Sequence, residues 1–114
     1  MSKQVLPLGT LIDKKDILNR RLHVGDVVIC MPSHTSTNVS GFGIIAGQTP
    51  KHVRVYEIRK DILLGILKIE EHYAHYTLDY AIRLHAGQLF KVTDPAFVNS
   101  NWALYITTEI RKQE

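Results

Sequence analysis

The residues best suited to chemistry lie between positions 51 and 60, where cationic side chains accompany an aromatic ring. These candidates are Lys51, His52, Arg54, Tyr56, Arg59 and Lys60. Cations matched to phosphates, beside a ring on which a base can stack, are what single-strand or RNA binding needs. Arg20 and Arg21 would extend the set if their segment packs nearby. The sequence therefore predicts a basic and aromatic face for nucleic acid, with an ordinary solvated strand face as the alternative.

The element expected to position these side chains is an antiparallel strand over residues 52–58, HVRVYEI. Side chains alternate along a strand, so Val53 and Val55 face one way while Arg54 and Tyr56 face the other. We expect the two valines to enter the core. Arg54 and Tyr56 are then predicted to point outward, where a ligand can reach them.

A metal site is the second kind of functional site that the sequence could indicate. His72 and His75 are spaced for one face of a helix, with Glu70, Glu71 and Asp79 nearby. On a hairpin turn the two rings diverge, and no cysteine or second histidine pair stands at metal-ligand spacing. We therefore predict a polar turn here, with no bound metal and no cofactor.

The sequence shows no recognisable set of catalytic residues. His23, His34 and His52 are scattered and define no Ser-His-Asp set. The glycines of residues 41–47 lie within an expected strand and lack the Lys-Ser/Thr ending of a phosphate loop. The chain is therefore predicted to be a binding module and not an enzyme.

A protein partner is the alternative to nucleic acid. Residues 62–72 and 76–85 are predicted to form a hairpin whose tip carries Tyr73 and His75. Aromatic residues are enriched at interface hot spots, so this tip could anchor a partner together with the polar loop 32–40. The alternative function is a protein–protein adaptor or inhibitor.

Length and composition limit the class of protein. The chain has 114 residues, 45% of them hydrophobic and 22% charged, which predicts one globular domain. The formal net charge of +3 would assist contact with an anion. Cys30 is the single cysteine and lies in an apolar run, so a buried, unreactive thiol is expected. No signal peptide or membrane-spanning run is recognised, and a cytoplasmic location is the default expectation.

The chain divides into four expected parts. Residues 1–21 read as an N-terminal arm, in which residues 1–12 add a short edge strand. Residues 22–58 read as a three-stranded unit, 59–93 as an elaboration and 94–110 as a closing turn and strand. The fold class is therefore mainly β: a small antiparallel barrel with an added hairpin and short helical turns. The oligomeric state is left open.

Several local elements carry clear signals. Val24-Gly25-Asp26 predicts a turn, because glycine adopts positive φ and aspartate bonds nearby amides. The β-branched run 27–31 predicts a core strand, and the glycines of 41–47 predict a strand with a bend. Residues 89–93 predict a short strand, and Asp94 with Pro95 starts a helical turn.

Other segments are ambiguous. One helical turn is expected within 13–21, with its acidic residues first. Residues 76–85 alternate with period two and favour a strand, although a helix capped by Thr77 and ended by Gly87 is the rival. A final strand is expected over residues 102–110. On one of its faces it would carry Trp102, Leu104 and Ile106.

The stretch that begins at Val24-Gly25-Asp26 and continues through 43–47 and 49–55 resembles the first strands of a Src-homology-3-like barrel. It is most similar to the KOW-type barrels of transcription and translation factors and to small bacteriophage proteins built on the same hairpin. The resemblance covers about a third of the chain, residues 22–58. It implies a barrel whose loops, and not its strands, contact nucleic acid. The Ser/Thr-rich loop 32–40 and residues 59–93 depart from the family pattern.

Overall fold

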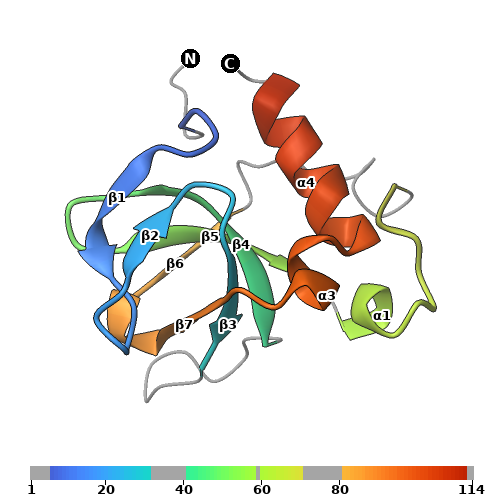
Figure 1. Cartoon of the computed structure of the whole chain (residues 1–114), viewed down its shortest axis with the longest axis horizontal. Helices are drawn as coiled ribbons and strands as arrows, with labels where there is room; N and C mark the ends of the chain where they lie inside the picture. The colour runs from blue at the N-terminus through green and yellow to red at the C-terminus, as the bar shows by residue number, and fades with distance from the viewer. Residues whose placement is uncertain (1–5, 32–40, 59, 71–80, 113–114) are drawn as a thin grey trace.

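The computed structural model describes residues 6–31, 41–58, 60–70 and 81–112, to which all structural statements refer. These residues form seven strands in two antiparallel sheets, with a few helices (Figure 1). The elements are β1 (Leu11–Lys15), β2 (Arg21–His23), β3 (Val27–Cys30), β4 (Phe42–Gln48), β5 (Val53–Ile58), α1 (Lys60–Leu63), β6 (Ile82–Leu84), the 3₁₀ turn η2 (Ala86–Gln88), β7 (Leu89–Val92), α3 (Pro95–Val98) and α4 (Asn101–Lys112).

The larger sheet has the strand order β6-β5-β4-β3-β7. Its edge strands β6 and β7 follow each other in the chain with only residues 85–88 between them, three of them in η2. Five flat strands spaced ~4.8 Å apart would place these edges ~19 Å from each other, farther than a 3₁₀ turn reaches. The sheet therefore curls strongly, although neither sheet closes on itself.

The three strands predicted between residues 22 and 58 are confirmed as β3, β4 and β5, paired in sequence order. Gly25 adopts φ +98° in the turn before β3, where Asp26 Oδ2 accepts a 2.7 Å hydrogen bond from the His23 amide. The predicted bend in β4 is also confirmed, because the register with β5 shifts between Ile45 and Gly47.

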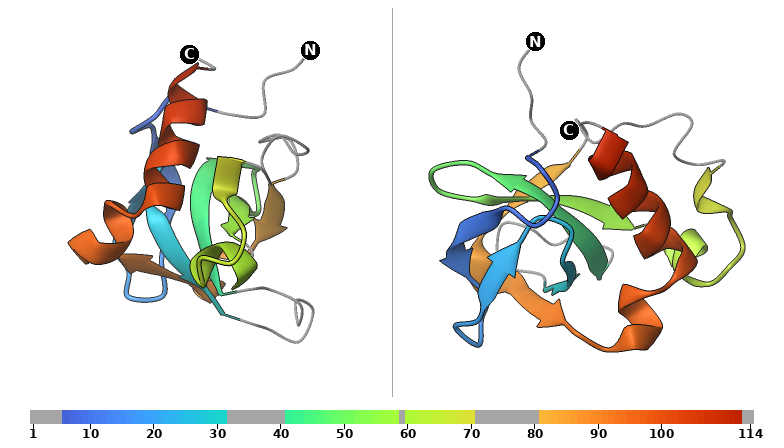
Figure 2. Two further views of the ribbon diagram at one scale, coloured as in Figure 1. Left: turned by 90° about the vertical axis from the view of Figure 1, so that its right-hand side faces the viewer. Right: turned by 45° about the horizontal axis from the view of Figure 1, so that its top comes forward.

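The hydrophobic core lies between the two sheets and α4. Side chains with at most 2% exposure include Leu22 of the smaller sheet, Ile45 and Val55 of the larger sheet and Ile106 of α4. Figures 1 and 2 show α4 running alongside the strands, with α3 and α1 near its first turn. None of the helices in the described ranges is long and apolar enough to span a membrane.

The expected final strand at 102–110 is wrong, because these residues lie in α4. Trp102, Ala103, Ile106 and Ile110 are buried while Leu104 is 52% exposed. This spacing follows the 3.6-residue period of a helix and gives α4 one apolar face. Ser100 Oγ accepts a 3.3 Å hydrogen bond from the Ala103 amide at the start of the helix, so Ser100 caps α4.

Two other expectations are corrected. The helical turn within 13–21 is wrong: β1 runs to Lys15, Asp16 Oδ1 accepts from the Leu18 and Arg20 amides, and Asn19 at φ +64° completes a tight reversal. The edge strand expected within residues 1–12 is found only at Leu11 and Ile12, where β1 begins, because residues 6–10 form no strand and residues 1–5 lie outside the described ranges. The strand expected over 62–72 is also wrong for its described part, 62–70, because Lys60–Leu63 forms α1 and residues 69–70 are helical.

The predicted strand at 76–85 is confirmed where the structure describes it, as β6, which excludes the rival helix for Ile82–Leu84. The remainder of the 62–85 hairpin falls mostly on residues 71–80, outside the described ranges. The strand at 89–93 and the helical turn at Asp94-Pro95 are confirmed as β7 and α3. Mainly β with short helical turns is therefore the observed fold class.

Cys30 is expected to be unreactive in the native protein. Its side chain is 2% exposed, and burial together with the negative charge of Glu57 raises the pKa of the thiol to about 12. The thiolate is the reactive form, so alkylation by iodoacetamide at mildly alkaline pH should be negligible until guanidinium unfolds the chain. Rapid labelling of the native protein, measured by mass spectrometry, would show instead that β3 opens locally.

Candidate functional site

The structure brings together only some of the residues of the predicted nucleic-acid face, and it places them beside residues other than those expected. His52 and Arg54 lie at the start of β5, next to exposed Lys51 in the β4–β5 turn. Lys60 follows the other end of β5, and Arg20 and Arg21 belong to the β1–β2 hairpin. The structure therefore distributes the candidate residues over three places, of which the start of β5 holds the largest share.

Pairing with β6 brings two further basic residues to the start of β5. Arg54 is the register partner of Arg83, and Val53 pairs with Leu84. Extending this register by one residue sets His52 opposite His85, and their ring centroids are 4.6 Å apart. We call His52, Arg54, Arg83 and His85 the β5–β6 cationic face. It lies opposite the face on which Val53 and Val55 are buried.

The expectation that Arg54 and Tyr56 point into solvent is wrong. Their exposed fractions are 7% and 4%. The reason is that β5 belongs to a sheet buried on both faces: Ile44 and Ile45 of the neighbouring β4 point to opposite faces, and both are fully buried. Tyr56 consequently offers no exposed ring for a base. Among residues 51–56, the side chains that solvent reaches are those of Lys51 and, in part, His52.

The accessible part of this surface is a small cationic patch. Arg83 and His85 of the β6 end are exposed, as is Lys51, while His52 is half-buried. The guanidinium of Arg83 presents a fork of donors that matches the geometry and charge of a phosphate group, and Lys51 adds a second exposed basic side chain in the β4–β5 turn. The arrangement can therefore hold an oxyanion.

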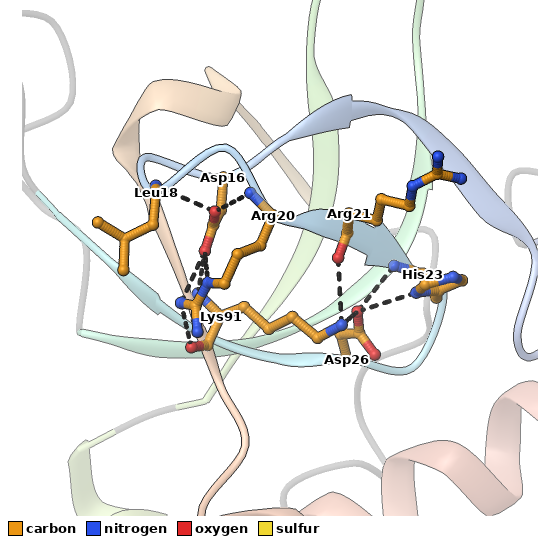
Figure 3. Close-up of polar contacts among 7 residues, drawn as sticks. All are labelled: Asp16, Leu18, Arg20, Arg21, His23, Asp26 and Lys91. Atoms are coloured by element: carbon orange, nitrogen blue, oxygen red, sulfur yellow. Dashed lines mark hydrogen bonds and ion pairs between the residues drawn. The ribbon is translucent and has the colours of Figure 1, made fainter.

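Arg20 is engaged within the fold. Its Nε donates to Asp16 Oδ2 over 3.0 Å, and its Nη2 donates to the Lys91 carbonyl oxygen over 2.6 Å. The guanidinium also lies 4.8 Å from the centre of the Phe90 ring. Figure 3 shows this cluster, with the Arg21 guanidinium directed away from it. Arg20 thus joins the β1–β2 turn to β7, while the exposed guanidinium of Arg21 takes no part in this cluster.

Asp16 is the centre of that cluster. The side chain is fully buried, and burial by itself would raise the pKa of the carboxyl. Hydrogen bonds from the Lys91 and Arg20 amides and from the Arg20 guanidinium outweigh burial, so the pKa of Asp16 lies below its ordinary value. A buried carboxylate with every oxygen bonded holds structure in place and is closed to a ligand.

Lys60 lies beside an apolar groove of about 570 Å³. We call this the aromatic groove; its lining residues are Phe42, Lys60, Leu63, Leu64, Ala96, Phe97, Ser100 and Trp102. The rings of Phe42 and Phe97 stack with centroids 5.1 Å apart, and Trp102 is tilted against Phe42 at 6.2 Å. A basic residue therefore does accompany aromatic rings in this protein, but at the far end of β5 from the cationic face.

Arg59, Tyr73, His75 and the loop 32–40 lie outside the described residues, so their predicted roles stay predictions. Most of the histidine and carboxylate set of residues 70–79 lies there too. Within the described ranges, no group of three or more His, Cys, Asp or Glu side chains is placed to hold a metal ion.

Sequence reasoning missed Arg83, His85, Phe97 and Trp102 as site residues. The alternation at 76–85 predicted a strand that carries Arg83 and His85, but no sequence pattern indicates that this strand pairs with β5. Trp102 was assigned to a strand, although Ser100 followed by the 102, 103, 106 and 110 spacing was a helix signal.

Comparison of the chain with protein-family models, with curated proteins and with solved structures gives no match.

Proposed function

We propose that this protein is a binding module that contacts the phosphate backbone of nucleic acid through the β5–β6 cationic face. The observation that carries the proposal is the exposure of Arg83 of β6 and of Lys51 in the β4–β5 turn, at the end of the sheet where β5 pairs with β6. Exposed basic side chains at one end of a sheet favour an anionic ligand. The Src-homology-3-like identity also remains a proposal, supported by the consecutive pairing of β3, β4 and β5 and by the strong curl of the sheet.

The proposed contact is electrostatic and independent of base sequence. Lys51 and Arg83 are exposed, permanent cations, whereas the Tyr56 ring is buried and cannot stack on a base. Backbone contacts fix position without reading sequence. Two phosphate contacts give a slope of log K against log salt of about −2 and a weak dissociation constant, roughly 10⁻⁴ to 10⁻⁶ M.

Replacing Arg83 by alanine is expected to weaken binding to short labelled duplex DNA, single-stranded DNA and RNA, measured by fluorescence polarisation. Between about 50 and 200 mM salt, the affinity of the unaltered chain for duplex DNA should fall about 12-fold, and that of Arg83→Ala about 3.5-fold, because one released counterion is lost. Lys51→Ala should behave in the same way.

Arg111→Ala is the matched control, because Arg111 is an exposed arginine on α4, outside the cationic face. It should leave both affinity and salt slope unchanged. The proposal fails if no salt-dependent binding is found with any of the three nucleic acids. It also fails if Arg83→Ala and Arg111→Ala reduce the affinity equally.

A further inference from the structure

We infer that the aromatic groove is a docking site for an acidic, amphipathic segment of a protein partner. This inference goes beyond nucleic-acid binding and is independent of it. The groove lies at the end of β5 where Lys60 begins α1, whereas the cationic face lies at the start of that strand. A six-residue strand separates the two by ~20 Å, so two ligands can be held at once.

Apolar side chains remain exposed around the groove. The exposed fractions are 64% for Leu64 and 37% for Phe97 of the lining residues, and 40% for Val98 beside Phe97. None of the four residues of α3 is buried, although Phe97 stacks on Phe42, so the apolar side chains of this helix stay largely accessible. Apolar side chains gathered at one exposed hollow are typical of interaction sites.

The groove is held in shape before any ligand arrives. Asp94 caps α3 by accepting a 2.9 Å hydrogen bond from the Ala96 amide, with Pro95 at the first helical position. Phe42 stacks under Phe97 and also contacts Trp102, which is 8% exposed and joined to the core. A platform of packed rings loses little conformational entropy when a partner side chain covers it, which favours affinity.

Charge selects the kind of partner. Among the described residues that line the groove, Lys60 is the sole ionisable one, and it is exposed. An acidic side chain beside the apolar anchors of a partner would neutralise Lys60, whereas a basic one would be repelled. The formal net charge of +3 acts in the same direction during approach. The occupant is therefore an acidic segment and not a basic one.

Size and shape indicate a peptide segment. A volume of about 570 Å³ lies within the range of ligand sites, ~300–1,000 Å³. The groove is open to solvent, which suits an amphipathic helix that inserts two or three large side chains at i, i+3 or i+4, and i+7. We expect leucine or aromatic anchors at these positions and aspartate or glutamate beside them.

The chain contains one tryptophan, Trp102, and it lines the groove, so its fluorescence reports occupancy directly. Short random peptides displayed on phage are selected on the full chain. Selected sequences without tryptophan are then synthesised and titrated while Trp102 emission is recorded. The expected result is saturable binding with a blue shift, by peptides that combine large apolar residues with Asp or Glu.

Three variants locate and define the contact. Phe97→Ser should lower peptide affinity about tenfold or more, as loss of an interface hot spot does. Lys60→Glu should lower it by about five- to tenfold for acidic peptides and raise it for analogues with Lys in place of Glu. Leu104→Ser is the control, because Leu104 is 52% exposed on α4 but does not line the groove. It should change nothing.

The inference is overturned if no selected peptide binds, or if Phe97→Ser binds every peptide as well as the unaltered chain. Enrichment of lysine and arginine in the selected peptides would overturn the acidic character. If Phe97→Ser instead weakens nucleic-acid binding as much as Arg83→Ala, the groove belongs to a nucleic-acid surface and the protein-partner inference fails. Peptide binding in the absence of nucleic-acid binding would support this inference alone.

Discussion

Replacing Asp16 by alanine is expected to lower the free energy of unfolding by about 3 kcal/mol. The carboxylate accepts hydrogen bonds from the Leu18, Arg20 and Lys91 amides and from the Arg20 guanidinium, at 2.8 to 3.0 Å (Figure 3). Its removal would leave these donors without their acceptor. The loss lies near the lower end for a buried ion pair, because the Arg20 side chain remains 35% exposed and can be hydrated.

Urea denaturation at neutral pH measures this loss. Asp13→Ala is the matched control, because the Asp13 side chain is 77% exposed in its contact with Lys14 and should contribute less than 0.5 kcal/mol, as surface pairs do. Near-equal stability of Asp16→Ala and Asp13→Ala would contradict the structural role of Asp16.

Lowering the pH should reveal the same contribution of Asp16 to stability. The folded-state pKa of Asp16 is below its unfolded value, so the native state favours the ionised form. This stability is fully present above the unfolded pKa, near 3.9, and is lost as the pH falls through the folded pKa. The unaltered chain should therefore lose its advantage over Asp16→Asn below about pH 4. A difference that is constant down to low pH would show that Asp16 does not titrate in this way.

Replacing Ile106 by alanine is expected to cost about 3 kcal/mol of stability, whereas Leu104→Ala should change it by less than about 0.5 kcal/mol. Ile106 is fully buried and Leu104 is 52% exposed, because positions two apart lie on different sides of a helix. In a strand both side chains would share one face and both substitutions would cost alike.

Thermal and urea unfolding of the two variants therefore discriminate the observed helix from the strand that alternation suggests. Circular dichroism of Leu104→Ala should be unchanged, since alanine favours a helix. Comparable destabilisation by both substitutions would contradict the packing of α4 against the core.

The two proposed surfaces together describe an adaptor. The cationic face and the aromatic groove lie at opposite ends of β5, one suited to phosphate groups and the other to an apolar, acidic segment. The two functions considered from the sequence, nucleic-acid binding and protein binding, are therefore compatible in one chain. The binding and peptide experiments test them separately, because Arg83 and Phe97 belong to different surfaces.

Local chemistry determined what could be predicted from the sequence. The β-branched run of β3, the glycine and aspartate turn at residues 25–26, and the Asp94-Pro95 start of α3 each depend on residues that are neighbours in the chain. Their conformations are set by φ/ψ preferences and by side-chain bonds to nearby amides. For the same reason the buried state of Cys30, inside an apolar run, was predicted correctly.

The tertiary structure decided everything that depends on distant partners. Asp16 bonds to Lys91 across 75 positions, and the tight turn at 16–20 is stable because β7 lies beside it. The face of β5 that carries Arg54 was expected to be solvated, yet both faces of this strand are covered. Arg83 lies opposite Arg54 because of the β5–β6 register, which no local sequence pattern encodes. The residue pattern at 102–106 is compatible with a strand as well as with a helix. Burial of Ile106 and Ile110 against the core stabilises the helix. In such segments the free energy gained by packing exceeds the difference in intrinsic propensity between helix and strand. Packing is a property of the folded chain and not of neighbouring residues.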